Sequence, residues 1–180
     1  PKALAEFSRA HPGIQLEVTC DLTLNLMKMY HAGRLDVALV KREPSAAVDG
    51  QRVWSEPLVW VGANDGVFET GGVTALVVSP EPCVYRKRAV EALGKAGGRA
   101  RAAYVCGSLA GALAAVRAGL GVAVLPRDFA PDDLAIDEGQ RMPPLADAEA
   151  VLLTAADAGL AARRLADHLA HALEDEPARF

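Results

Sequence analysis

The sequence predicts an α/β protein made of two successive α/β segments. Helical periodicities alternate with short apolar runs of strand length, and the connections between them are short and contain Gly, Pro and Asp. The alternation breaks once, over residues 64–72, where Gly, Asn and Asp are frequent, and it restarts at residue 74. Helices that connect consecutive strands favour parallel pairing, so we expect mainly parallel sheets in two Rossmann-like lobes.

The first segment combines both periodicities in short succession. The turn His11-Pro12-Gly13 ends the opening helix, because proline restricts the residue before it and glycine permits a tight turn. Apolar and polar side chains alternate from Ile14 to Cys20, as in a strand with one buried face. The predicted elements are a helix over 3–10, a strand over 14–20, a helix over 23–32, a strand over 35–40 and, on either side of Pro57, one or two strands within 53–63.

The second segment repeats this organisation. Its elements are strands over 74–79, 102–106, 122–125 and 150–155, a short strand near 134–136, a helix from the Pro80-Glu81-Pro82 turn to about 96, a helix over 108–118, and a final helix capped by Asp157. The last helix carries leucines on one face, as expected of an amphipathic helix that packs on a sheet.

The bulk composition excludes several classes of protein. Apolar residues make up 51% and charged residues 23% of the 180-residue chain, which is ordinary for a globular domain. The net charge of −4 and the absence of a Lys/Arg cluster with interleaved aromatics argue against direct binding to a nucleic-acid backbone. No apolar run approaches the ~20 residues that a membrane span needs, so we expect no contact with a membrane.

The cysteines and the absence of catalytic motifs limit the chemical functions that we expect of this chain. Three cysteines without a CxxC spacing argue against a disulfide framework or a structural zinc site and favour a reducing, cytoplasmic location. The sequence has no G-x-S-x-G elbow and no Walker motif, and Gly119-Leu120-Gly121 precedes a predicted strand where a dinucleotide loop would follow one. We therefore expect no enzyme, no metal and no cofactor.

The candidate ligand-binding residues lie in three turns at predicted strand ends. In open α/β sheets, ligands bind beyond the carboxyl ends of the strands, close to helix N-termini. Two lobes that face each other would bring such turns together across a central cleft. The residues selected in this way are Cys20, Asp21, Ser79, Cys83, Arg86, Gly107 and Ser108.

Two of these residues suit an anionic ligand, and each has a simpler alternative role. Ser108 opens a predicted helix, where unpaired N–H groups and the helix dipole favour an anion, but an ordinary N-cap serine is worth about 1 kcal/mol. Arg86 offers a guanidinium that can hold a carboxylate through two parallel hydrogen bonds. Because Lys87 and Arg88 follow it, Arg86 would also suit a solvated basic face.

The thiols leave a further alternative open. Cys20, Cys83 and Cys106 all fall at or just beyond predicted strand ends. Thiols at helix N-termini can be reactive, which permits a redox sensor or a soft-metal site. The simpler interpretation is three small apolar side chains that line turns.

Several stretches together resemble the effector-binding domain of LysR-type transcription regulators. They are His11–Leu16 after an amphipathic helix, Ala32–Leu39, Glu56–Val61, Gly107–Leu109 and, most specific, Ala114–Pro126 with the sequence AAVRAGLGVAVLP. The resemblance covers nearly the whole chain. It implies the fold of type II periplasmic binding proteins, with lobe I formed by 1–62 and 146–180 and lobe II by 63–145.

The same resemblance carries expectations about function. It implies a small effector in the cleft, pairing of such domains into a homodimer or homotetramer, and DNA binding through an N-terminal winged helix-turn-helix domain absent from this chain. The family's first strand, whose turn contributes hydroxyl ligands, is also absent from it. The alternatives are a solute-binding protein of a transporter, which shares the fold, and an enzyme such as a prephenate-type dehydratase, whose catalytic threonine or acid pair we cannot place.

Overall fold

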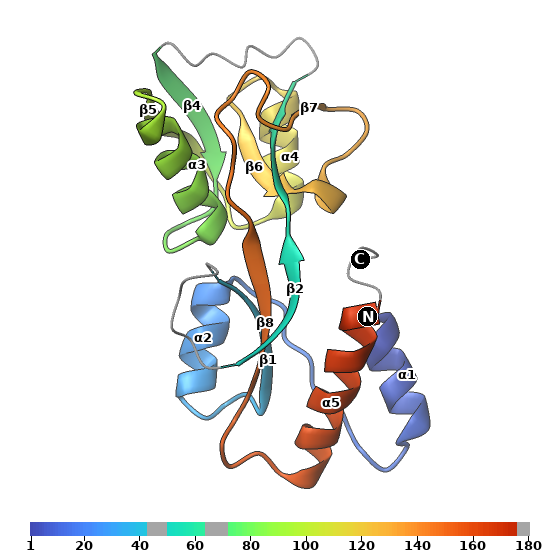
Figure 1. Ribbon diagram of the computed structural model, residues 1–180. Helices are drawn as coiled ribbons and strands as arrows, with labels where there is room; N and C mark the ends of the chain where they lie inside the picture. The colour runs from blue at the N-terminus through green and yellow to red at the C-terminus, as the bar shows by residue number, and fades with distance from the viewer. Residues whose placement is uncertain (43–49, 64–71, 176–180) are drawn as a thin grey trace. The chain divides into compact units, whose positions relative to one another are not determined.

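A computed structural model describes residues 1–42, 50–63 and 72–175 (Figure 1). The chain divides into two compact units, unit 1 with Pro1–Ser55 and Glu149–Phe180, and unit 2 with Glu56–Ala148. The chain therefore passes from one unit to the other twice, after Ser55 and after Ala148.

Unit 1 is a three-stranded sheet with helices on both faces. Its strands are β1 (Val37–Arg42), β2 (Gln51–Glu56) and β8 (Ala148–Thr154), and its helices are α1 (Lys2–Ala10), α2 (Thr23–His31) and α5 (Leu160–Asp175). The strand order is β1-β8-β2, and β1 runs antiparallel to β8 with Val37 opposite Thr154. β8 reaches this sheet through a long connection from unit 2, so no helical crossover requires it to pair in parallel.

The two faces of this sheet follow from strand alternation. Ala38, Val40, Val151 and Leu153 pack with Leu26, Met27 and Tyr30 of α2. The intervening residues, Leu39 and Leu152 among them, pack on the other face with Ala166, Ala170 and Leu173 of α5. Figure 1 accordingly shows α2 and α5 on opposite sides of β1 and β8. α1 packs on α5, where the Phe7 ring lies 5.5 Å from the His168 ring.

Unit 2 contains two small sheets joined by a bridge. Its elements are β3 (Leu58–Gly62), β4 (Val73–Val78), α3 (Val84–Lys95), β5 (Arg99–Val105), α4 (Leu109–Arg117), β6 (Ala123–Pro126), the 3-10 helix η1 (Arg127–Phe129) and β7 (Ala135–Asp137). β4 and β5 pair in parallel, whereas β3 lies between β6 and β7 and is antiparallel to both. A parallel bridge between Leu76 and Val122 connects the sheets.

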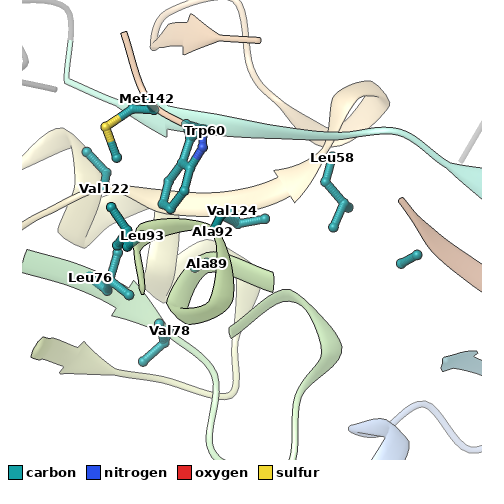
Figure 2. Packing of buried hydrophobic residues seen from close by; sticks show 11 residues of the cluster. Leu58, Trp60, Leu76, Val78, Ala89, Ala92, Leu93, Val122, Val124 and Met142 are labelled. Atoms are coloured by element: carbon teal, nitrogen blue, oxygen red, sulfur yellow. The ribbon is translucent and has the colours of Figure 1, made fainter. Parts of the chain in front are cut away.

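Helices cover both faces of the joined sheets, which explains why β3, β6 and most of β4 are apolar along their whole length. Leu58, Trp60, Leu76, Val78 and Val124 face Ala89, Ala92 and Leu93 of α3. Figure 2 shows the Trp60 indole extending from β3 toward α3, close to Met142. Alternate residues, including Val59, Val61, Val77 and Leu125, face Ala115 and Val116 of α4.

Three expectations differ from the structure. The predicted strand over 14–20 is wrong: these residues form no strand in the described part of the chain, and Val18 is 57% exposed. The alternation supplies an apolar face, but a strand also needs a neighbour for its backbone, and the hydrogen bond found here is the turn bond from Ile14 N–H to His11 O. The sheets are also not mainly parallel: among the described strand pairs, β4 and β5 are parallel, whereas β1–β8, β3–β6 and β3–β7 are antiparallel.

The third difference concerns the boundary between the lobes. Residues 56–62 and 146–148, expected in lobe I, lie in unit 2. The reason is that β3 pairs with β6 and β7, and Ala148 belongs to the Trp60 core. The predicted break over 64–72 falls almost entirely outside the described residues. The other predicted helices and strands are confirmed to within a few residues.

No helix in the described ranges combines the length and the apolar character that a membrane span needs.

Candidate ligand-binding site in unit 2

The turns that follow β4 and β5 begin side by side at one edge of unit 2. Val78 is paired with Val105 in the parallel register, and the Cys106 N–H donates to Val78 O at 2.9 Å. Parallel strands end at the same edge of their sheet, and ligands of α/β proteins collect there. This register brings the 79–83 turn next to the 106–108 turn.

A recess opens at this edge, between α3, β4 and β6. Ser79, Cys83, Tyr85 and Arg86 line it together with apolar side chains, and the cavity has a volume of about 40 Å³ and is partly open to solvent. The apolar lining comes from Leu76, Val77, Val78, Ala89, Ala112, Ala123, Val124 and Leu125. An apolar wall with a few polar groups on one side is typical of small-molecule sites.

Arg86 is the cation of this recess. Its Nη1 donates to Ser79 O at 3.4 Å, and its Nη2 lies 2.9 Å from Glu81 Oε1. The Arg86 side chain is 23% exposed, whereas that of Glu81 is 71% exposed. The guanidinium is thus anchored to the end of β4 and also contacts a carboxylate that lies mainly in solvent.

Tyr85 forms the deeper polar contact near the recess. Its hydroxyl donates to Glu56 Oε2 at 2.8 Å, and the Glu56 residue is only 4% exposed. Burial, followed by the negative charge of Glu56, raises the pKa of Tyr85 well above its ordinary value. Tyr85 therefore remains a hydrogen-bond donor over the whole physiological pH range.

The second turn is organised around the start of α4. Ser108 is the N-cap, and its Oγ accepts the Gly111 N–H at 3.4 Å. The Cys106 Sγ lies 3.4 Å from the Ser108 nitrogen, and a Cβ at Gly111 would lie 2.7 Å from the same sulfur. Glycine at position 111 therefore leaves the space in which the thiol packs against the first turn of the helix. The expected N-cap role of Ser108 is confirmed.

Comparison with known proteins assigns the family. The family model of the LysR substrate binding domain matches residues 1–174. The chain belongs to this family. The HTH-type transcriptional regulator DgdR of Burkholderia cepacia is 34% identical over 146 residues, which cover 81% of this chain and 49% of DgdR. The chain therefore spans about half the length of this relative.

Solved structures show the same fold for this LysR domain. The regulatory domain of Synechocystis PCC6803 CcmR in complex with 2-PG has a TM-score of 0.75 and 18% identity, over 98% of this chain and 91% of that one. The effector binding domain of QuiR in complex with shikimate has a TM-score of 0.76 and 11% identity, over 98% and 90%. The fold is thus the type II periplasmic-binding-protein-like α/β fold of LysR effector domains.

The structure places five of the seven predicted site residues of the LysR domain in unit 2. Ser79, Cys83 and Arg86 line the recess, and Gly107 and Ser108 lie in the neighbouring turn. The register of β4 and β5 is what brings these two groups to the same edge.

Cys20 and Asp21 belong to unit 1. Cys20 is exposed at the end of the 14–20 segment. The Asp21 carboxylate accepts the Asn25 side-chain amide at 2.9 Å and the Leu22 N–H at 2.7 Å, and these bonds hold its pKa below the ordinary value. Asp21 thus orders the start of α2, and its part in ligand binding stays a prediction.

Sequence reasoning missed three residues of the recess region. Glu81, the acidic partner of Arg86, was visible as an opposite charge within the same turn. The pair of Glu56 and Tyr85 was not visible, because Glu56 ends β2, Tyr85 lies 29 residues later on α3, and they meet only in the folded chain. The three cysteines are free, and no group of three or more metal-binding side chains is found in the part of the chain described.

Proposed function

We propose that this LysR domain senses a small organic anion, which binds at the recess of unit 2 through Arg86. The observation that carries the proposal is one guanidinium set among apolar walls at the edge where β4 and β5 end. Ser79 and Cys83 of the recess, and Gly107 and Ser108 of the neighbouring turn, would contribute polar contacts.

Two kinds of evidence support an organic anion. A guanidinium binds a carboxylate through charge-assisted hydrogen bonds, which are stronger than neutral ones. The two structural relatives were solved with 2-PG and with shikimate, and shikimate is a carboxylate. The apolar lining of the recess suits the carbon skeleton of such an acid.

We further propose that the full protein is a cytoplasmic bacterial transcription regulator without catalytic activity. Its relatives are HTH-type regulators about twice as long as the matched region. An N-terminal winged helix-turn-helix domain would bind DNA, and a homodimer or homotetramer of these domains would set the spacing of the DNA-reading helices. Effector binding would shift that arrangement to the extent that the effector prefers one state.

Calorimetry of the 180-residue chain with a panel of small acids, including shikimate and 2-PG, tests the proposed site. We expect Arg86→Gln to weaken the binding of the best acid about ten- to a hundredfold, because hydrogen bonds to a charged group contribute about 1.5–3 kcal/mol. Arg117→Gln is the matched control: Arg117 is the last residue of α4, is paired with Asp133 and does not line the recess.

Two results would count against the proposal. Equal affinity of wild type and Arg86→Gln would remove Arg86 from the site. Small-angle scattering of the full-length regulator that is unchanged by every acid in the panel would contradict the idea that binding alters its arrangement.

A further inference from the structure

The guanidinium of the recess already has a carboxylate partner from the chain itself. Arg86 Nη2 lies 2.9 Å from Glu81 Oε1, in the short connection between β4 and α3. The other terminal nitrogen, Nη1, donates to Ser79 O. The Arg86 guanidinium thus has two partners: the backbone carbonyl of Ser79 and the mainly exposed carboxylate of Glu81.

The two partners of this ion pair are anchored very differently. Arg86 stands on the first turn of α3, and its side chain is 23% exposed. Glu81 precedes the helix, and its side chain is 71% exposed. An ion pair with one partner in solvent contributes little free energy, and its carboxylate can leave the contact and be hydrated. Glu81 is therefore the partner that can move away.

A ligand carboxylate at the recess would need the same donor. A guanidinium presents its N–H groups in one plane, and a carboxylate binds best when it takes two parallel bonds from them. Ser79 O and Glu81 each contact one of the two terminal nitrogens, and the Glu81 charge would repel a second carboxylate on the same guanidinium, so a ligand carboxylate binds most favourably when Glu81 withdraws.

We propose that Glu81 is an intramolecular competitor for Arg86, so that it sets the affinity for anionic effectors. The proposal rests on the proposed function and adds a residue that opposes binding. The carboxylate of the effector replaces that of Glu81 on the guanidinium, which restores the ion pair. A neutral ligand cannot make this replacement, so the exchange selects for acids over amides or alcohols of the same shape.

The test compares benzoate with its neutral isostere benzamide on the 180-residue chain, by ligand-observed NMR titration up to millimolar concentrations. Glu81→Gln should bind benzoate about two- to fivefold more tightly than wild type, the factor that corresponds to a solvent-exposed ion pair. It should bind benzamide as wild type does.

The matched control is Glu91→Gln, which makes the same change in net charge. Glu91 lies on α3, contacts Lys87 at 3.7 Å and Arg88 at 3.5 Å, and does not line the recess. We expect it to leave the affinity for benzoate unchanged. The Glu81→Gln effect should also vanish in the Arg86→Gln background.

The possible outcomes separate this proposal from the proposed function. If Arg86→Gln weakens benzoate binding but Glu81→Gln does not tighten it beyond Glu91→Gln, the anion site stands and the competitor idea is wrong. Tightening that persists without Arg86 would show a general charge effect and overturn the proposal. Failure of both wild type and Glu81→Gln to bind benzoate would overturn it as well, since removing a competitor should raise the affinity.

Discussion

Replacing Tyr85 by Phe tests the polar contact beneath the recess. Phenylalanine keeps the ring that packs against the Trp60 core and removes only the hydroxyl, which donates to Glu56 Oε2 at 2.8 Å. A hydrogen bond to a charged group contributes about 1.5–3 kcal/mol. Glu56 is 4% exposed, so water cannot fully replace the lost donor, although Glu56 keeps other interactions. We expect the free energy of unfolding of unit 2 to fall by about 2 kcal/mol.

The assay is urea unfolding followed by tryptophan fluorescence. The chain has two tryptophans, Trp54 in unit 1 and Trp60 in unit 2, so a Trp54→Phe background reports on unit 2 through Trp60. Tyr104→Phe is the matched control, because Tyr104 lies on β5 of the same unit and is 39% exposed. We expect this control to change the stability by less than about 0.5 kcal/mol.

The stability of the Tyr85→Phe variant should also depend differently on pH from that of wild type. The pKa of Tyr85 is raised by burial first and by Glu56 second, so the folded state holds this proton more tightly than the unfolded state does. Its contribution to stability is complete below the unfolded value of 10.0 and is lost as the pH rises above it. Tyr85→Phe should therefore reduce the loss of stability above pH 10. A change below about 0.5 kcal/mol at pH 7, or an unaltered alkaline slope, would refute the argument.

Two further substitutions test the backbone of unit 2. Burial acts to raise the pKa of Asp137, but the N–H groups of residues 139–142 donate to its carboxylate and hold the pKa below 3.8. Asp137→Asn should cost about 2–4 kcal/mol at pH 7. The difference in stability between wild type and Asp137→Asn should disappear as the pH falls below about 4. Acid-unfolding curves that stay parallel for the two proteins would contradict this expectation. At Gly121 an added Cβ would lie 2.4 Å from Ala75 O, so Gly121→Ala should lower stability by about 1–3 kcal/mol in urea unfolding. Gly94→Ala, where a Cβ meets nothing within 4 Å, should cost nothing, and equal losses at both glycines would be inconsistent with the clash.

Local patterns of side chains were enough to predict most of the helices and strands in their order along the chain. The helices around Leu26 and Ala115, the strands through Val59 and Val77, and the N-cap at Ser108 each follow from side-chain periodicity or from a single capping group. The segment 14–20 shows where this reasoning fails. Its alternation is that of a strand, but strand formation also depends on a partner, and a pattern within one segment carries no information about that partner.

For the recess of unit 2, the sequence by itself determined which residue types stand after the strands: Ser79, Cys83 and Arg86 after β4, and Gly107 and Ser108 after β5. Only the tertiary structure decided how they meet. The parallel register that pairs Val78 with Val105 aligns the two turns. Packing of α3 on the sheets forms the recess and brings Tyr85 to Glu56, 29 positions away in the chain. Contacts of this kind depend on the free energy of packing whole elements together, which no local pattern of side chains contains.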